Sequence, residues 1–396
     1  MKIKVGVIFG GPTTEHEISI ITAVQAMNHF DEEKYDIVPI YITKDRQWYS
    51  SNLLKDISTY KDLKLLKKYS KKVTLYNNKG SYVLQSRGLI KQIIDELDIV
   101  FPIVHGYNME DGNIQGYLDV VGVPYVGSDI YGCVVGQDKV FMKQIFESIQ
   151  LPITKYKWFY DHEYQNNKEE VLNNLKVLKF PVIVKPARLG SSIGIGKAEN
   201  TNELEEKIET AINYDEKIVV EEIVDNLVEL NCSVLGSNET QETSVIEEVS
   251  GKDDFLSFED KYIGNGKKGK IANKTKGILN TDRIIPAKID NNLKKQIEDM
   301  SKKAFKALGA AGVVRIDYLM NKETKELYIN ELNTVPGSLS FYLWDKKDIS
   351  YTELLDNLIT LAIKRARKKD KKTYSFSSNV LESYNGTKGK FKGKLK

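Results

Sequence analysis

From Asp98 to Val104 the chain is apolar at almost every position, and no other segment constrains the fold as much. An apolar run of this length is typical of a strand that is buried on both faces of a parallel sheet. It ends at His105-Gly106, and residues 112–121 follow with helical spacing. The start of the chain has the same order, because the strand-like Ile3–Phe9 breaks at Gly10-Gly11 and leads into a helical pattern. These strand–loop–helix units predict an open parallel α/β sheet over the first ~125 residues.

Two loops of this sheet follow strand ends, at residues 10–17 and 105–115. Ligands of open α/β sheets collect at the carboxyl ends of the strands, so both loops are expected on one ligand-binding rim. Residues 36–42 are predicted as a further strand. The lysine-rich stretch from Lys55 to Lys72 has no clear apolar period, and we expect a solvent-exposed insertion there.

The rest of the chain indicates further domains, since 396 residues exceed the size at which one hydrophobic core usually stops growing. A boundary is predicted at Gly127-Ser128-Asp129. A small α+β block follows, and strands dominate again from Asn231. Residues 264–277 are rich in Gly, Lys and Asn and are predicted to form a mobile loop.

Composition excludes several classes of protein. The 58 Lys and Arg nearly balance the 55 Asp and Glu, so the net charge of +3 does not indicate a nucleic-acid coat protein. Cys133 and Cys232 are too few and too far apart for a disulfide scaffold or a zinc knuckle. No apolar run is long enough to cross a bilayer. We therefore expect a soluble intracellular protein without nucleic-acid or membrane partners.

Two strand-like runs near the C-terminus carry the most informative polar residues. Arg315 and Asp317 share a face of the first run, and Glu331 and Asn333 share a face of the second, because side chains alternate along a strand. If the runs pair as a hairpin, two carboxylates and an amide oxygen meet beside a cation. Such hard oxygen ligands suit Mg²⁺ carrying a nucleoside triphosphate. The alternative is a solvated polar sheet face with an ion pair.

A glycine- and serine-rich loop at residues 190–196 follows a short apolar strand that ends at Lys185. Its backbone N–H groups and hydroxyls could face phosphate oxygens, and Lys185 and Lys139 would add positive charge. The loop is not a P-loop, because Lys197 is followed by Ala198. A hairpin that merely turns is the alternative.

Glu15 and His105 lie in the two rim loops and are ambiguous on their own. Glu15 could hold an ammonium group, or it could simply help to cap the following helix. His105 could donate to an anion, or it could be a satisfied residue at a strand end.

Taken together, these motifs resemble those of the D-alanine–D-alanine ligases, a family of the ATP-grasp superfamily. The resemblance covers about residues 3–345 and rests on the joint order and spacing of several motifs. They are Gly10-Gly11 with Glu15-x-Glu17, His105-Gly106 with Glu110-Asp111-Gly112, Pro124-Tyr125-Val126-Gly127-Ser128, Asp138-Lys139, Val184-Lys185-Pro186 with Gly190-Ser191-Ser192, Lys261-Tyr262, Arg315-Ile316-Asp317 and Glu331-x-Asn333-Thr334-x-Pro336-Gly337.

The resemblance implies a three-domain ATP-grasp architecture. Residues 1–127 would form the N-terminal parallel α/β domain, residues 128–222 a small α+β lid domain, and residues 223–367 a C-terminal domain with an antiparallel sheet. Residues 368–396 are expected to be a basic, disordered tail. A homodimer in the cytoplasm is also implied.

The resemblance also implies the roles of individual residues. Glu15 would hold the ammonium of the first D-alanine and join Ser191 and Tyr262 in closing the site. His105 would lie near the first substrate's carboxylate, whereas Lys261 and Tyr342 would face the second substrate. Arg315 and the N–H of Gly337 would stabilise the oxyanion of the tetrahedral intermediate. ATP would be bound by Lys139, Lys185, Ser191, Ser192, Glu221, Glu222, Val224 and Glu229, and Mg²⁺ or Mn²⁺, as two ions, by Asp317, Glu331 and Asn333.

The implied reaction joins two D-alanines for peptidoglycan synthesis through a D-alanyl phosphate made with ATP. Ligases that take D-serine or D-lactate as the acceptor are alternatives, and Tyr262 argues against D-lactate. A non-catalytic ATP-binding protein is the alternative from another class. The chain departs from the family pattern at Met109, where Gly is usual, and at residues 338–344, which bear on the acceptor.

Overall fold

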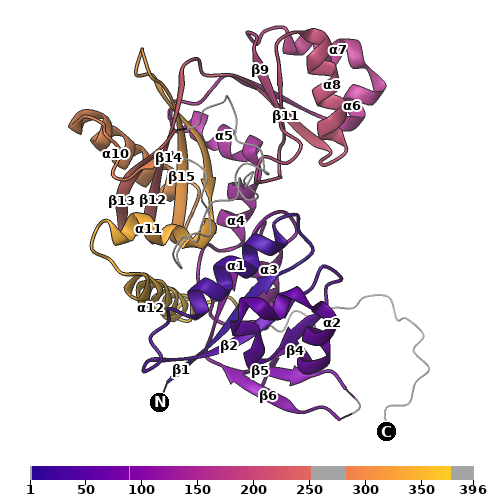
Figure 1. The fold of residues 1–396 in the computed structure, drawn as a ribbon, viewed down its shortest axis with the longest axis vertical. Coiled ribbons are helices and arrows are strands. Elements are labelled where there is room, and N and C mark those ends of the chain that lie inside the picture. The colour runs from indigo at the N-terminus through magenta and orange to yellow at the C-terminus, as the bar shows by residue number, and fades with distance from the viewer. Residues whose placement is uncertain (1, 89, 251–281, 376–396) are drawn as a thin grey trace, which may run out of the picture.

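The computed structural model describes residues 2–88, 90–250 and 282–375. In this part of the chain three sheets are separate in space (Figure 1). The N-terminal sheet lies at the bottom of the view, the middle sheet at the upper right and the C-terminal sheet at the upper left. Each sheet falls within one of the three ranges expected from the sequence.

The N-terminal sheet is parallel only in part, although the sequence predicted an open parallel sheet over the first ~125 residues. Its strand order is β6-β5-β4-β3-β2-β1-β7, and β1 pairs in parallel with both β2 and β7. The four remaining strands are antiparallel additions, so the sheet is mixed rather than wholly parallel. The strands are β1 (Ile3–Gly10), β2 (Tyr35–Ile42), β3 (Trp48–Ser50), β4 (Lys71–Asn78), β5 (Ser81–Ser86), β6 (Ile93–Leu97) and β7 (Ile99–Ile103).

Helices α1 (His16–Met27) and α3 (Asn113–Val121) begin in the two rim loops after β1 and β7. The expected insertion at 55–72 is exposed or half-exposed at every position except Leu66. It contains the 3₁₀ turn η2 (Ile57–Lys61) and the helix α2 (Leu63–Tyr69), preceded by η1 (Asn52–Lys55). Leu54 and Leu66 are fully buried in the core of this unit, which anchors the segment although its lysines remain in solvent.

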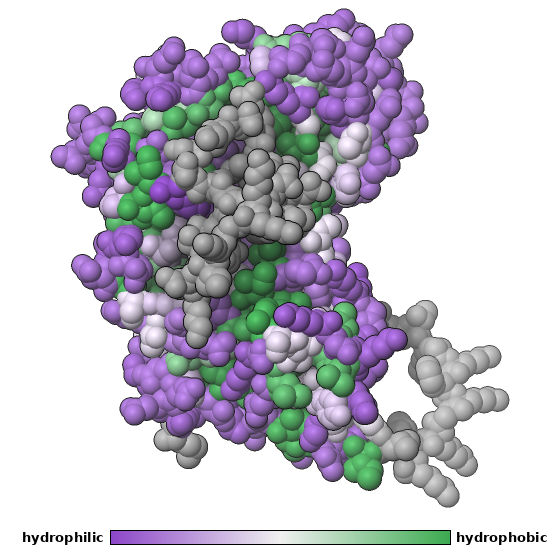
Figure 2. All heavy atoms as spheres, viewed as in Figure 1, coloured by the Kyte–Doolittle hydropathy of each residue, from purple (hydrophilic) through white to green (hydrophobic). Residues whose placement is uncertain are grey.

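The middle sheet is antiparallel, in the order β10-β9-β11-β8. Its strands are β8 (Tyr156–Tyr160), β9 (Val182–Pro186), β10 (Gly196–Ala198) and β11 (Lys217–Glu222). Helices α6 (Asp161–Asn166), α7 (Lys168–Leu175) and α8 (Thr201–Ile212) pack on it (Figure 1). Figure 2 shows that the outer surface of these helices is almost entirely hydrophilic, which is expected for amphipathic helices on one face of a sheet.

The C-terminal sheet is antiparallel and has the order β14-β13-β12-β15-β16. Its strands are β12 (Leu227–Gly236), β13 (Gln241–Ser250), β14 (Asp282–Ile284), β15 (Gly312–Asn321) and β16 (Leu327–Asn333). Helices α10 (Asn291–Ala307) and α5 (Lys139–Ser148) pack on it, and α4 (Ile130–Gln137) precedes α5. Met142 and Phe146 of α5 share a core with Val314 and Ile316. Helix α5, which the sequence assigned to the lid, therefore packs with the C-terminal sheet.

The last described elements return to the N-terminal unit. After β16 come η3 (Gly337–Ser340), α11 (Phe341–Asp345) and α12 (Tyr351–Lys369). Leu354, Leu355 and Leu358 of α12 lie in the same core as Val5 and Phe9 of β1. No helix in the described ranges is long and apolar enough to span a membrane. The predicted loop 264–277 and residues 376–396 of the predicted tail lie outside the described residues. The predicted tail begins at 368, but Lys368 and Lys369 belong to α12.

Candidate active site

A cavity of about 210 Å³ lies between the middle sheet and the hairpin of β15 and β16. All eight residues predicted to bind ATP line it, from Lys139 and Lys185 to Glu229. Glu331 lines it as well, so one predicted metal ligand reaches the same space. Its other walls include Ile183, Leu189, Ile195, Ile223, Leu227, Leu319 and Asn330. The cavity thus combines apolar walls with a few charged groups, which is the usual construction of a small-molecule site.

Glu221, at the end of β11, is the most buried acid of the cavity. Its Oε2 atom lies 3.2 Å from Lys185 Nζ and 3.1 Å from Lys143 Nζ, and it accepts a 3.0 Å hydrogen bond from Thr154 Oγ1. Burial alone would raise the pKa of Glu221, but the two lysines outweigh it and hold that pKa at about 2. Glu221 is therefore a buried carboxylate that stays ionised.

The β15–β16 hairpin has the register expected from the sequence. Arg315 pairs with Asn333 and Asp317 pairs with Glu331, and all four side chains are half-buried on one face. Arg315 donates to both carboxylate oxygens of Asp317, at 2.6 and 2.7 Å, and Asn333 Nδ2 donates to Asp317 at 3.1 Å. Across the cavity, Lys139 Nζ lies 3.3 Å from Glu331 Oε2.

These residues fit a divalent cation by their chemistry. Asp317 and Glu331 offer carboxylate oxygens and Asn333 an amide oxygen, all hard donors on one sheet face. Only two of these three residues are acids, and the described residues contain no group of three or more His, Cys, Asp and Glu side chains that could hold a metal ion. Two carboxylates with one amide leave open positions for phosphate oxygens, as Mg²⁺ prefers.

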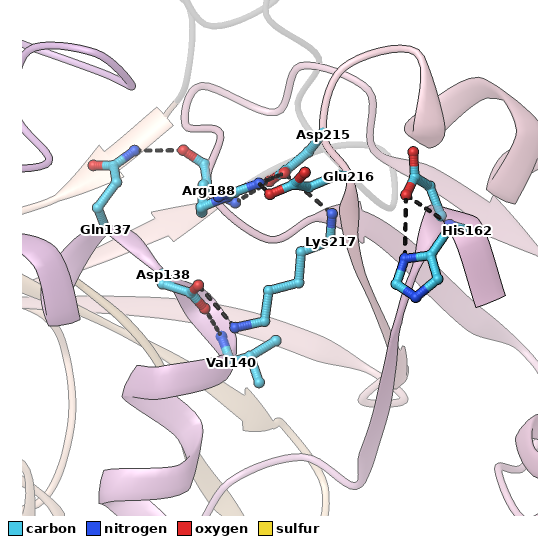
Figure 3. A network of polar contacts seen from close by, with 9 residues as sticks. Gln137, Asp138, Val140, His162, Arg188, Asp215, Glu216 and Lys217 are labelled. Carbon is cyan, nitrogen blue, oxygen red and sulfur yellow. Dashed lines mark hydrogen bonds and ion pairs between the residues drawn. The ribbon is translucent and has the colours of Figure 1, made fainter. Parts of the chain in front are cut away.

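The loop before Ser191 is anchored by the polar network in Figure 3. Arg188 donates to Asp215 through its backbone N–H (2.8 Å) and its guanidinium, and its carbonyl accepts from Gln137 Nε2 at 2.6 Å. Beside it, Lys217 Nζ lies 2.9 Å from Asp138, the residue that caps α5. The network holds the start of the loop against β11 and against the helix that carries Lys139.

The side chain of Glu15 contacts this loop at Ser191. Ser191 Oγ donates a hydrogen bond to Glu15 Oε1, which joins residues 176 positions apart. Glu15 occupies the position before α1, but its side chain does not cap the helix. A Cβ atom on Gly190 would lie 2.7 Å from Glu15 Oε2, so a side chain at 190 would push the two loops apart.

His105 is linked through Thr22 to the loop that carries Gly337. It is buried, and its Nε2 is 3.2 Å from Thr22 Oγ1, which in turn accepts from the N–H of Ser338 at 3.2 Å. Burial lowers the pKa of His105 to about 4, so the imidazole is neutral at pH 7. Three successive residues after Gly337, namely Ser338, Leu339 and Ser340, have left-handed φ values of 51–52°. Side chains rarely adopt this backbone conformation, and strain of this kind collects at functional sites.

Tyr342 is held in a cluster beside Arg315. Its hydroxyl lies 3.2 Å from Glu247 Oε2, which also accepts from Asn231 Nδ2 at 3.1 Å. Arg283 Nη1 donates to Glu247 Oε1 at 2.9 Å, and its guanidinium lies 5.4 Å from the centre of the Tyr342 ring. Lys261, predicted to face the second substrate, and Tyr262, predicted to close the site, lie outside the described residues.

Sequence reasoning assigned no role to three buried residues at the site, Glu110, Lys143 and Glu247. Glu110 accepts from Gly106 N, Thr334 Oγ1 and Val335 N, which links the two rims. Lys143 could have been suspected, because it lies one helical turn beyond Lys139 and therefore on the same helix face. Nothing in the local pattern around Glu247 distinguishes it from a surface acid.

Comparison with known proteins shows the family of this chain. The model of the D-ala D-ala ligase N-terminus matches residues 4–128, and that of the D-ala D-ala ligase C-terminus matches residues 145–360. A D-alanine–D-alanine ligase of Thermosipho melanesiensis is 38% identical over 380 residues, which covers 96% of this chain and 98% of the relative.

Two solved structures share the fold. The D-alanine-D-alanine ligase of Coxiella burnetii superposes with a TM-score of 0.77 at 26% identity, covering 93% of this chain and 96% of its own. The VanG D-Ala:D-Ser ligase of Enterococcus faecalis superposes with a TM-score of 0.75 at 28% identity, covering 91% of this chain and 100% of its own.

Proposed function

The chain belongs to the D-alanine–D-alanine ligase family, and we propose that the cavity between β9–β11 and the β15–β16 hairpin is its ATP site. As a member of this family it is an ATP-dependent ligase that joins two D-alanines for peptidoglycan synthesis. One observation carries the proposed site: eight residues predicted to bind ATP, from five different segments, line one cavity together with Glu331.

The reaction requires ATP and D-alanine to bind next to each other. A carboxylate is a poor acyl donor, so the γ-phosphoryl group of ATP is first transferred to a carboxylate oxygen of one D-alanine, which gives an acyl phosphate and ADP. The amine of the second D-alanine, once deprotonated, attacks the acyl carbon, and inorganic phosphate leaves as the peptide bond forms. Phosphoryl transfer of this kind depends on positioned positive charge more than on covalent help from the protein.

We assign the phosphates of ATP to Lys139, Lys185 and the loop with Ser191 and Ser192. Both lysines reach the cavity wall, and the loop is fixed at its start by Arg188. The adenine and ribose are assigned to the end lined by Glu221, Glu222, Val224 and Glu229. This arrangement leaves the γ-phosphate on the side of Glu331 and Lys139, which lie 3.3 Å apart.

We propose that Asp317, Glu331 and Asn333 hold two Mg²⁺ or Mn²⁺ ions, which neutralise the phosphates when bound. The family uses a divalent metal with ATP. The protein's own part is to keep the oxygen donors on one face of the hairpin. Arg315 orients Asp317 through two parallel hydrogen bonds. We assign Arg315 and the N–H of Gly337 to the oxyanion of the tetrahedral intermediate.

The first D-alanine is assigned to the space between Glu15 and His105. Glu15 accepts from Ser191, so its carboxylate faces the loop over the cavity and can hold an ammonium group. His105 is neutral and can donate only one N–H, which suits a hydrogen bond to the substrate carboxylate rather than an ion pair.

The second D-alanine is assigned to the space near Tyr342. The Tyr342 hydroxyl is 3.2 Å from the buried Glu247, so its proton is already donated to a carboxylate. The phenol oxygen still has lone pairs that can accept a hydrogen bond from the hydroxyl of D-serine. This contact therefore does not discriminate between the two acceptors, and D-serine stays the alternative to D-alanine.

Measuring phosphate release from ATP with and without D-alanine, and identifying the product by mass spectrometry, tests the proposal. We expect release only with D-alanine, and one D-alanyl-D-alanine per phosphate. ATP consumption independent of D-alanine, or a product formed with D-serine in preference to D-alanine under direct competition, would contradict the assignment.

Two further proposals concern the whole protein. We propose a homodimer, as the family resemblance implies, which sedimentation velocity can test. We also propose that the protein works in the cytoplasm, since Cys133 and Cys232 are both buried free thiols, as suits a reducing compartment.

A further inference from the structure

Lys143 is a buried cation to which the proposed mechanism assigns no task. It lies on α5, and its side chain is only 1% exposed. Its ammonium group lies 3.1 Å from Glu221 Oε2, donates to Thr154 Oγ1 at 3.1 Å and faces the Tyr156 ring at 5.5 Å. Removing a lysine ammonium group from water costs free energy, even beside a carboxylate. A lysine buried in this way therefore indicates a specific task.

The two oxygens of Glu221 differ in their contacts. Oε2 is within 3.2 Å of Lys143 Nζ, Lys185 Nζ and Thr154 Oγ1. Oε1 is buried as well but has no hydrogen-bond partner among the described residues. Glu221 lines the cavity, so an acceptor oxygen is left unsatisfied at its wall. A buried acceptor without a partner indicates a ligand that donates to it.

The two lysines on Glu221 are not equivalent. Lys185 lines the cavity and also lies 3.4 Å from Asn330 Oδ1, so it can turn toward phosphate. Lys143 is not among the residues that line the cavity. If Lys185 turns to a phosphate, Lys143 remains as the positive charge fixed beside Glu221. Burial lowers the pKa of Lys143 while Glu221 raises it, and the carboxylate in return stays ionised.

We propose that Lys143 is a positioning residue for base selection: it holds Glu221 by Oε2 so that Oε1 accepts a hydrogen bond from the 6-amino group of adenine. The inference rests on the proposed ATP site and adds to it the residue that enforces the choice of base. An ionised carboxylate can only accept hydrogen bonds, whereas a protonated one can also donate. Keeping Glu221 ionised therefore favours a base with an amino group at that point and disfavours one without it.

The test uses purine riboside triphosphate, which lacks only the 6-amino group of ATP. The ratio of kcat/KM for ATP to kcat/KM for this analogue, in D-alanine-dependent phosphate release, reports the contact directly. We expect the wild type to prefer ATP by a factor on the order of 10², because a buried polar group is left unpaired with the analogue. In Lys143→Met the preference should fall at least tenfold, mainly through KM for ATP, while D-alanine is still required.

A pH profile separates this role from a merely structural one. Without Lys143 the pKa of Glu221 rises, so the carboxyl is more protonated at low pH and ionised again at high pH. The preference of Lys143→Met for ATP should therefore recover between pH 6 and pH 9, whereas that of the wild type should stay constant. Lys155→Met is the matched control, because Lys155 is 56% exposed and pairs at 3.5 Å with the neighbouring Glu222; its preference should equal that of the wild type.

An unchanged preference in Lys143→Met, or a loss that does not recover at high pH, would overturn the inference. If this variant does not fold, Glu221→Gln serves instead, since the amide is uncharged at every pH. It should show a reduced preference that does not vary with pH, and a preference equal to that of the wild type would again overturn the inference. Failure of the wild type to release phosphate with D-alanine would instead refute the proposed function.

Discussion

Arg315 shows how the geometry of one side chain can be predicted and tested. Its Nε and Nη2 atoms donate in parallel to the two oxygens of Asp317, which a lysine cannot reproduce with one ammonium group. In Arg315→Lys we expect kcat to fall by a factor on the order of 10² or more, since the oxyanion is held less well. KM for ATP should change much less. Arg367→Lys on the exposed side of α12 is the control, and a wild-type kcat in Arg315→Lys would make Arg315 a structural residue.

Glu331 carries a second prediction at this scale. Glu331→Gln removes one carboxylate charge where the phosphoryl group is transferred and where Lys139 now pairs at 3.3 Å. D-Alanine-dependent turnover should be abolished while the fold, followed by circular dichroism, is unchanged. Phosphate release near the wild-type rate would show that Glu331 is not a metal ligand.

Glu110 gives a prediction with a defined pH dependence. Burial, together with Glu15, raises the pKa of Glu110 to about 7. A carboxyl whose pKa is raised on folding stabilises the protein fully below its unfolded pKa of about 4.5, and this contribution is lost as pH rises through about 7. Glu110→Gln has one acceptor oxygen for the N–H groups of Gly106 and Val335, so it should be less stable by about 1–3 kcal/mol. Urea unfolding should show the largest difference from the wild type near pH 5 and a smaller one at pH 8; a difference that grows with pH would contradict the pKa shift.

What the sequence could predict about residues follows from their separation in the chain. Arg315, Asp317, Glu331 and Asn333 lie on neighbouring strands, and strand alternation is enough to bring them together. Lys143 and Glu221 are 78 positions apart on different elements, so no local pattern could relate them. The pairing of Glu15 with Ser191 followed from the family resemblance and not from spacing.

At the scale of elements, the left-handed turn after Gly337 was not predicted, because its residues are ordinary Ser and Leu. Ser340 has φ 51°, and its hydroxyl is buried without a partner among the described residues. Ser340→Gly removes the strain of a side chain at left-handed φ and also removes the unsatisfied hydroxyl. We expect the free energy of unfolding to rise by about 1 kcal/mol in urea titrations. Ser70→Gly is the matched control, since Ser70 also has an unsatisfied hydroxyl but an ordinary φ of −109°. It should not be stabilised, and an equal gain in both variants would assign the effect to the hydroxyl alone.

In the N-terminal sheet, sequence analysis missed the antiparallel strands β3 to β6. Most of their positions are exposed or half-buried, and in β4 only Val73 and Leu75 are buried. The predicted strands β1, β2 and β7 are buried at most positions, which gives a stronger apolar signal. Prediction thus followed burial: the centre of the sheet was predictable and its antiparallel edge was not.

For the whole molecule, α12 is the element that joins the last domain to the first. Leu354, Leu355, Leu358 and Ile359 are at most 1% exposed and pack against β1. Each buried side chain of this size contributes roughly 1.5–3 kcal/mol, so together they approach the whole stability of a typical domain. Deleting residues 351–396 should therefore leave a protein that does not fold, as judged by circular dichroism and gel filtration.

Deleting only residues 376–396 removes a segment rich in lysine and glycine and leaves this packing intact. That shorter deletion should keep wild-type stability and D-alanine-dependent ATP consumption, and loss of activity in a folded protein would show that the last 21 residues act at the site.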